Sequence, residues 1–265
     1  MRTAKLLKMQ LGFERLEERT VLNGTVTVDS LTTSPGTLTV AGDSQNNAVI
    51  IHQIGKNVDG NPIIQVLGAG TKLSNLDTGQ TGYSFTFGST GGDDITAVDI
   101  EMGGGSDRVT FTNTTVSGPI TVNMDDPGSG GFGDGNDVLS MSNVHTTGDV
   151  ININLGSGTN VATLVKVSSE GDFSLDGGNG RDVVALNSVA SNASGELNDT
   201  FSVDLGGGRF NTLAVINCSD GNGNGDGEFE DDGTSGIITG VGNHFATQTI
   251  IGFQFRYGDL KHDLA

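Results

Sequence analysis

The pattern that decides the fold is clearest in residues 173–184, which read FSLDGGNGRDVV. A short alternating strand comes first, then a Gly-rich corner, an acid at Asp182, and the start of a second strand. The same order recurs, complete or as the corner alone, in four further stretches: IEMGGGSDRVTF (100–111), GDGNDVL (133–139), ININLGSGTNV (151–161) and FSVDLGGGRFNTL (201–213). Weaker copies precede them at 91–95 and at 42–50, where Asn47 holds the acid position.

The spacing of these units predicts the architecture. The acid or amide positions of the five clearest copies are 30, 23, 22 and 29 residues apart: Asp107, Asp137, Asn160, Asp182 and Asn211. A rung of this length suits an all-β chain wound as a parallel β-helix, or solenoid, with Gly/Asp-rich corners. Alternation predicts that Ile151 and Ile153 point inward while Asn152 and Asn154 point outward. Periodicity does not show strand pairing, so an antiparallel sandwich or roll is the alternative.

The composition agrees with a narrow core. Hydrophobic residues make up 34 % of the 265 residues, and 43 residues are Gly. Ordinary globular chains contain roughly 45–50 % apolar residues, so a thick core of large side chains is not expected. Low hydrophobicity and high net charge are also typical of disordered chains. The ordered alternation of apolar residues favours a folded solenoid instead.

The charge limits the partners. Asp and Glu number 32 against 13 Lys and Arg, for a net charge of −19. Such a chain is poorly suited to nucleic acid or to an anionic membrane, and it favours a neutralising cation or a self-repelling surface. No stretch approaches the roughly 20 apolar residues of a transmembrane helix. A single cysteine, Cys218, excludes an internal disulfide, and the four His lie too far apart to suggest zinc.

Residues 1–24 differ from the body at 25–265. Residues 1–19 hold five basic and three acidic side chains, and Leu6, Met9, Phe13 and Leu16 recur at helical spacing. We expect a short helical segment there. Basic residues interrupt every apolar run, so the segment is not a standard signal peptide.

Within this segment, residues 13–22 read FERLEERTVL. They resemble the Leu-Glu-x-Arg-x-x-Leu segment that opens many large secreted or surface proteins of planctomycete bacteria. The resemblance implies an export or sorting element ahead of a secreted or cell-surface repeat protein. A short amphipathic helix that caps the body is the alternative.

The corners suggest calcium. Residues 177–182 (GGNGRD) and 133–137 (GDGND) resemble the Gly-Gly-x-Gly-x-Asp repeat of haemolysin-type calcium-binding β-rolls. That resemblance implies Ca²⁺ at the better corners, because Gly turns expose carbonyl oxygens and Asp adds charge. These corners are Asp94, Asp107, Asp137 and Asp182. Here each motif stands once per rung rather than in tandem. The alternative is that Asp and Asn cap the Gly turns through hydrogen bonds to the backbone.

A second calcium candidate is the acidic stretch 220–231, DGNGNGDGEFED, which fits the twelve-residue calcium loop. It resembles the loops of EF-hands and dockerins. The expected oxygen donors are Asp220, Asn222, Asn224, Asp226, Glu228 and Asp231. No amphipathic helix flanks the stretch, so it predicts an isolated calcium loop between β elements. A plain acidic turn is the alternative.

The sequence favours a non-enzyme. The eight basic residues of the body are scattered singly, and neither a Gly-x-Ser-x-Gly nor a His-Glu-x-x-His motif occurs. We therefore expect an exported, calcium-binding structural or adhesive protein of the cell surface or extracellular matrix, whose partners are surface polysaccharides or other surface proteins. A carbohydrate-binding or polysaccharide lyase-like β-helix with a polar face is the alternative. The alternating stretch 250–257 is expected to form the last rung or a cap.

Overall fold

The structure, a computed structural model, describes residues 24–31, 34, 36–89, 94–125, 135–191, 200–207 and 211–219. It also describes the backbone of strands 226–230, 236–241, 247–251 and 253–257. These residues form strands, turns and bridges, with no helix among them. The predicted all-β class is confirmed. The predicted helical segment lies in 1–23, outside the described residues.

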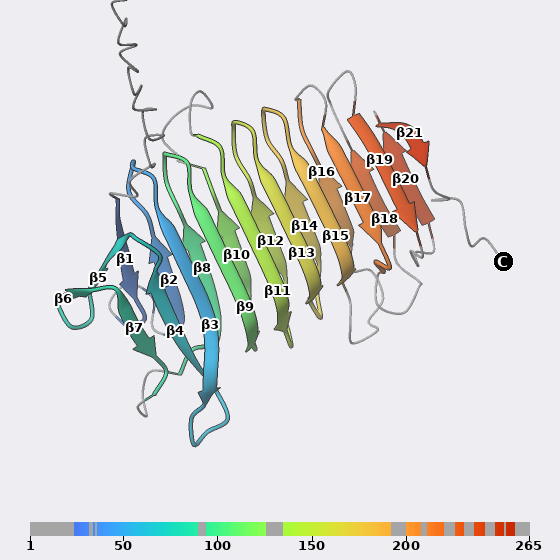
Figure 1. Ribbon diagram of the computed structural model, residues 1–265. Coiled ribbons are helices and arrows are strands. Elements are labelled where there is room, and N and C mark those ends of the chain that lie inside the picture. Colours follow the sequence, from blue (N-terminus) through green and yellow to red (C-terminus); the bar gives the residue numbers. More distant parts are fainter. Residues whose placement is uncertain are drawn as a thin grey trace, which may run out of the picture.

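The strands form two sheets (Figure 1). Sheet A has the order β20 (Thr247–Ile251), β18 (Asp226–Glu230), β16 (Phe201–Asp204), β14 (Phe173–Asp176), β12 (Ile151–Asn154), β10 (Ile120–Asn123), β8 (Ala97–Glu101), β2 (Thr37–Ala41), β1 (Thr25–Asp29), β5 (Lys72–Asn75) and β6 (Gln80–Gly82). Sheet B has the order β21 (Phe253–Tyr257), β19 (Gly236–Val241), β17 (Thr212–Ile216), β15 (Val183–Ala190), β13 (Val161–Ser168), β11 (Val138–Thr146), β9 (Arg108–Val116), β3 (Ala48–Lys56), β4 (Pro62–Gly68) and β7 (Ser84–Phe87).

From β8 onward the chain alternates between the sheets, and each strand pairs in parallel with the strand two positions later. We call one strand of sheet A and the following strand of sheet B a pass. One series of consecutive Cα partners runs through Arg108, Val138, Val161, Val183 and Thr212. Each of these residues directly follows an acid or amide position, so the 30-, 23-, 22- and 29-residue intervals are the lengths of successive passes.

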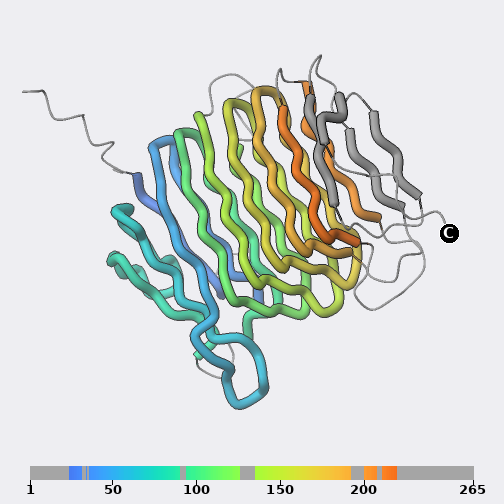
Figure 2. The backbone as a smooth tube through the Cα atoms, turned by 45° about the vertical axis from the view of Figure 1, so that its right-hand side comes forward, coloured from blue at the N-terminus to red at the C-terminus, as the bar shows by residue number. Residues whose placement is uncertain are grey.

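The N-terminal strands pair differently. β1 with β2, β3 with β4, β4 with β7, and β5 with β6 are antiparallel, so both sheets are mixed. The β3–β4 connection is short enough for a hairpin, with Gly60 at φ 90° in its turn and the Asn57 N–H donating to Asn61 O. We call β4–β7 the N-terminal hairpins. Figure 2 shows them beside the stacked passes.

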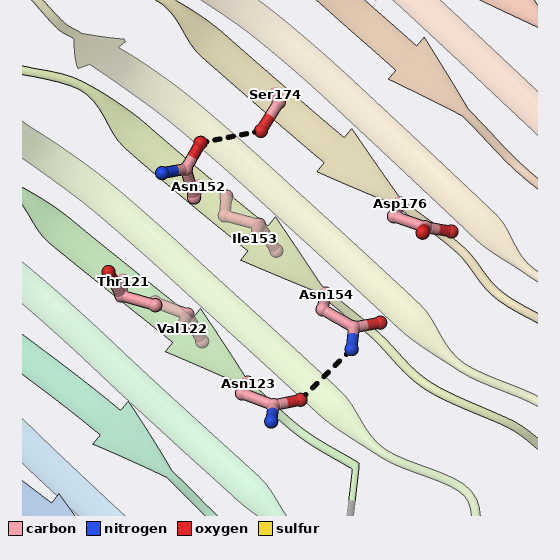
Figure 3. A pocket seen from close by; sticks show the side chains of 8 residues that line it. All are labelled: Thr121, Val122, Asn123, Asn152, Ile153, Asn154, Ser174 and Asp176. Atoms are coloured by element: carbon pink, nitrogen blue, oxygen red, sulfur yellow. Dashed lines mark hydrogen bonds between the residues drawn. The ribbon is translucent and has the colours of Figure 1, made fainter. Parts of the chain in front are cut away.

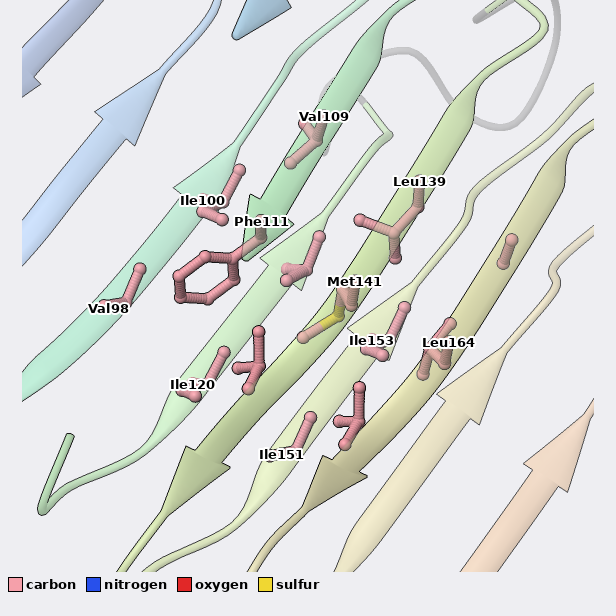
Figure 4. Close-up of a cluster of buried hydrophobic side chains, with 14 of the residues drawn as sticks. Val98, Ile100, Val109, Phe111, Ile120, Leu139, Met141, Ile151, Ile153 and Leu164 are labelled. Atoms are coloured by element: carbon pink, nitrogen blue, oxygen red, sulfur yellow. The ribbon is translucent and has the colours of Figure 1, made fainter. Parts of the chain in front are cut away.

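The core lies between the sheets. Val98, Ile120 and Ile151 from sheet A face Phe111 and Met141 from sheet B (Figure 4), and all are at most 1 % exposed. Within each sheet, the inward side chains of successive strands lie in register. Phe173, for example, stacks on its Cα partner Phe201 with ring centroids 4.9 Å apart. A core only one inward side chain deep from each sheet explains how a chain with so few apolar residues folds.

The sheet B strands contain a bend that the alternation of apolar and polar residues does not predict. Five non-glycine residues have φ between 52° and 56°: Asn113, Asn143, Lys166 and Ser188 within β9, β11, β13 and β15, and Asn217 directly after β17. Each lies six residues after an acid or amide position, so the bends stack from pass to pass. The bend leaves two successive residues facing outward, as at Thr112 and Asn113, before Thr114 returns to the interior.

The stretch predicted to form the last rung does contain strands. Residues 250 and 251 end β20, which pairs with β18, and β21 pairs with β19. Within the described residues these are the final strands of sheets A and B.

Candidate functional site

The predicted corner residues form a buried row along one edge of sheet B. Each member directly precedes a strand of that sheet and is at most 1 % exposed. We call this set the Asp/Asn row: Asn47, Asp107, Asp137, Asn160, Asp182 and Asn211. Its side chains point into the molecule because the alternation that exposes Arg108 and Val161 directs their predecessors inward.

Hydrogen bonds link the row from end to end. In every step Oδ1 of one member accepts the backbone N–H of the member one pass earlier. The donor–acceptor distances are 2.7 Å from Asn47 to Asp107, 2.7 Å from Asp107 to Asp137, 3.0 Å from Asp137 to Asn160, 3.2 Å from Asn160 to Asp182 and 2.8 Å from Asp182 to Asn211. A buried N–H without an acceptor is costly, so each side chain helps to satisfy a corner group of its neighbour. The Asn160 N–H is shared, because it also donates to Arg181 O at 3.2 Å.

The residues that directly precede the row members form a second series of hydrogen bonds, which runs in the opposite direction along the stack. Asn46 Oδ1 accepts the Ser106 N–H at 2.8 Å, and Ser106 Oγ accepts the Asn136 N–H at 2.9 Å. Asn136 Oδ1 in turn accepts the Thr159 N–H at 2.8 Å. Neighbouring corners are therefore tied together by side chains in both directions along the stack.

Glycine permits this close stacking of corners. Gly135 and Gly158 lie two residues before row members, with φ of 110° and 120°. A Cβ on Gly135 would overlap the Gly105 carbonyl, and one on Gly158 would overlap the Gly135 carbonyl. Gly is needed here both for the backbone conformation and for the approach of the next corner.

Asp107 is a buried carboxyl with a raised pKa. Its Oδ2 is buried and has no hydrogen-bond partner. Burial raises the pKa of this carboxyl to about 7; the Asn47 N–H bond opposes the rise and the charge of Asp43 adds to it. A carboxylate cut off from water in this way favours its neutral form.

The structure separates the predicted corner ligands. Asp107, Asp137 and Asp182 share the Asp/Asn row, but Asp94 lies outside it, half-buried, with its Oδ1 accepting a 2.7 Å bond from Asn57 Nδ2. In the described part of the chain, no three His, Cys, Asp or Glu side chains are grouped as metal ligands. The contacts of the row match the turn-capping alternative. Calcium at these corners stays a prediction.

The acidic stretch 220–231 is described only in part. Asp220, Asn222, Asn224 and Asp231 lie outside the described residues. Residues Asp226–Glu230 form β18, in which Glu228 is the Cα partner of Ser202 on one side and Thr249 on the other. Positions seven to eleven of the predicted loop are thus a paired strand, which differs from a loop inserted between strands. Calcium binding by Asp226 and Glu228 stays a prediction.

Sequence analysis correctly placed Asn152 and Asn154 on an outer face. They lie on sheet A among outward residues of β10, β12 and β14, which we call the sheet A face: Thr121, Asn123, Asn152, Asn154, Ser174 and Asp176. These residues line a shallow open depression of about 330 Å³ (Figure 3). Its side chains are interlinked: Asn154 Nδ2 donates to Asn123 Oδ1 at 3.1 Å, and Ser174 Oγ donates to Asn152 Oδ1 at 2.8 Å.

Turn capping also orients the sheet A face. Oδ1 of Asn123, Asn154 and Asp176 accepts the backbone N–H two residues later, at 3.1, 3.0 and 2.8 Å. Next to this face on β8, burial raises the pKa of Asp99, and the charge of Glu101 raises it further. The face therefore presents fixed amides and hydroxyls at its centre and carboxylates on either side.

Comparison with known proteins adds no family. The described residues contain no helix long and apolar enough to cross a membrane. No protein-family model, curated protein or solved structure matches the chain.

Proposed function

We propose that the chain is an exported, non-enzymatic β-solenoid with a structural or adhesive role at the cell surface or in the extracellular matrix. The observation that carries this proposal is the regularity of sheet A: from β8 to β16, each strand places polar side chains at the same two outward positions. Neighbouring strands lie about 4.8 Å apart and alternate residues about 7 Å apart, so the side chains form a flat grid.

The sheet A face is the adhesive surface in this proposal. Its turn-capped Asn and Asp side chains are held in place before any ligand arrives, which lowers the entropy cost of binding. Amide and hydroxyl groups both donate and accept hydrogen bonds, as an extended polysaccharide with many hydroxyls requires. A repeating polymer can contact several strands at once, so weak contacts add up.

Polysaccharide binding is tested with the double variant Thr121→Val/Asn152→Ala in the full-length chain, by sedimentation with insoluble cell-wall polysaccharides. Neither side chain caps a turn, so the fold is retained. The control is Thr163→Ala, an exposed position on the outer side of sheet B. We expect the double variant to lose most of the bound fraction and the control to keep it. If wild type, the double variant and the control bind equally, the sheet A face is not the binding surface. Release of unsaturated sugar products supports the lyase-like alternative.

Calcium belongs to this proposal as a stabiliser of the acidic body. Asp176 and Asp204 are Cα partners on neighbouring strands, and like charges in that position destabilise a sheet. The stretch 220–231 matches the calcium loop in sequence, and calcium-rich surroundings outside the cell would then couple folding to export.

Calcium dependence is tested by circular dichroism and thermal unfolding in EDTA, in millimolar Ca²⁺ and in millimolar Mg²⁺. We expect a higher melting temperature in Ca²⁺ than in Mg²⁺, and loss of that difference in Asp220→Ala. Identical melting in EDTA and Ca²⁺ rules out the calcium part of the proposal and leaves the adhesive part untouched.

A further inference from the structure

We propose that the outer face of sheet B is the interface of a homodimer, in which the sheet B faces of two copies of this chain pack against each other about a two-fold axis. We call this surface the sheet B face: the outward residues of β9, β11, β13, β15 and β17, five from each of the first four strands and three from β17. The inference does not depend on the proposed function.

The sheet B face carries no acidic side chain, although acids outnumber bases by 32 to 13 in the chain. Its only residues that are charged at pH 7 are Arg108 and Lys166. The same alternation on sheet A places four acids outward between β8 and β16: Asp99, Glu101, Asp176 and Asp204. Because two strongly acidic molecules repel each other, an acid-free face is the surface at which two copies can approach most closely.

Apolar side chains lie together on this face. Val138, Val161 and Val183 are consecutive Cα partners on β11, β13 and β15, and Ala185 is the partner of Ala214 on β17. Val161 is 38 % exposed, so the row of Val side chains is partly open to solvent in the isolated chain. The centre of a protein–protein interface is typically apolar and poor in charge. The other side chains of the face are mostly hydroxyls and amides, which can donate and accept hydrogen bonds across a two-fold axis.

The size of the sheet B face fits a stable dimer. β9 to β17 lie side by side, so the face is continuous (Figure 1). With strands about 4.8 Å apart and a rise of about 3.3 Å per residue, it measures roughly 24 by 26 Å, or about 600 Å² in projection. A standard interface takes about 20–30 residues and about 800 Å² of accessible surface from each partner. Accessible area exceeds projected area because side chains stand above the sheet, so the two values agree.

A second copy fits this face better than an acidic polymer does. Binding of an acidic polysaccharide or a nucleic acid needs clustered bases, whereas Arg108 and Lys166 lie on different strands of a chain with a net charge of −19. A partly apolar patch with few charges is complementary to itself, as the two-fold axis of a homodimer requires. In such a dimer both sheet A faces point away from the interface.

The test is sedimentation equilibrium of the full-length chain in EDTA, between about 1 µM and about 1 mM protein and at low and high salt. Val161→Glu places an acid on the middle strand of the face, and the matched control Ser202→Glu makes the same charge change at an outward position of sheet A. Circular dichroism checks that both variants fold, and Thr163→Glu replaces Val161→Glu if that variant does not.

Wild type and Ser202→Glu should form dimers. Val161→Glu should associate at least about tenfold more weakly, because each dimer would bury two additional carboxylates. Thr163→Ala keeps its position small and uncharged, so it should dimerise like wild type. High salt should strengthen the wild-type dimer, since it screens the repulsion between two chains of net charge −19.

Three results overturn the proposal. One is a wild-type chain that stays monomeric at every concentration and salt. Another is equal dimerisation of wild type and both Glu variants, which puts the interface elsewhere. The third is an association that weakens in high salt and is lost in Ser202→Glu, which assigns it to the acidic sheet A face of one copy packed on the sheet B face of the next. These measurements contain no polysaccharide, so the proposed adhesion is tested separately.

Discussion

Asp182 Oδ1 accepts the backbone N–H of Asn160 at 3.2 Å, although the two residues are 22 positions apart in the sequence. The same relation connects every neighbouring pair in the Asp/Asn row. Hydrogen bonds to buried Asp and Asn side chains thus join successive corners. The Asp members of the row are the same residues that the sequence suggests as calcium ligands.

Removal of an amide from the row should be costly. Asn160→Ala deletes the acceptor of the Asp137 N–H and the donor to the Gly156 carbonyl, and all of these groups are buried. We expect a loss of about 1–3 kcal/mol in the free energy of unfolding, the usual cost of an unsatisfied buried group. Urea denaturation measures it, with exposed Thr163→Ala as the control. A loss no larger than that of the control would show that the row adds nothing to stability.

The corner glycines should differ from ordinary turn glycines. Gly158→Ala combines an unfavourable φ of 120° with overlap of the Gly135 carbonyl, whereas Gly60→Ala has φ of 90° and no atom within 4 Å of the new Cβ. The left-handed region alone costs roughly 1–2 kcal/mol. We expect Gly60→Ala to lose about that amount and Gly158→Ala clearly more, as measured by chemical denaturation. Equal losses would mean that the corners are not closely stacked.

The stacked bends should prefer asparagine. Lys166 has φ of 54°, a conformation that Asn adopts several-fold more readily than most residues. Because Asn113 and Asn143 hold the same position in earlier passes, Lys166→Asn should stabilise the chain by about 0.5 kcal/mol. Lys166→Val, with a β-branched side chain, should lower the melting temperature. Indifference to both changes would show that the bend is not maintained in solution.

Cys218 should be unreactive while the chain is folded. It is fully buried, and burial raises the pKa of its thiol to about 11. Thiol reagents attack the thiolate, so we expect negligible labelling by Ellman's reagent at pH 8 until denaturant unfolds sheet B. Rapid labelling of the folded chain would place Cys218 at the surface.

The spacing of Gly and Asp predicted the strand units and their intervals because each pass repeats one corner. The alternation around Ile151 and Ile153 correctly predicted which side chains face out. The parallel pairing from β8 onward had to come from the structure, since periodicity within a strand carries no information about its neighbour. The hairpins after β3 also interrupt the pattern, so Asn47 rather than Asp94 adjoins Asp107.

The sequence does not show what the side chains of the corner acids contact. A Gly-Gly-x-Gly-x-Asp stretch can aim its carboxylate at a cation or at a neighbouring backbone N–H, and the residue types are the same for both. The bend was missed because Lys166 and Ser188 give no sign of a positive φ, although its six-residue offset from each row member is visible once the corners are aligned.

The most direct test of the Asp/Asn row as a structural cap is the stability of Asp182→Asn and Asp182→Ala, each measured by urea denaturation in EDTA and in millimolar Ca²⁺. Asn keeps the oxygen that accepts the Asn160 N–H and is the natural residue at two neighbouring positions of the row. The Asn160 N–H also donates to Arg181 O at 3.2 Å, so it keeps one acceptor when Asp182 is truncated. We predict that Asp182→Asn stays close to wild type and that Asp182→Ala loses about 0.5–1.5 kcal/mol, the net contribution of one hydrogen bond, with both differences unchanged by calcium. Equal losses in both variants that appear only in calcium would contradict the cap and assign Asp182 to a metal site.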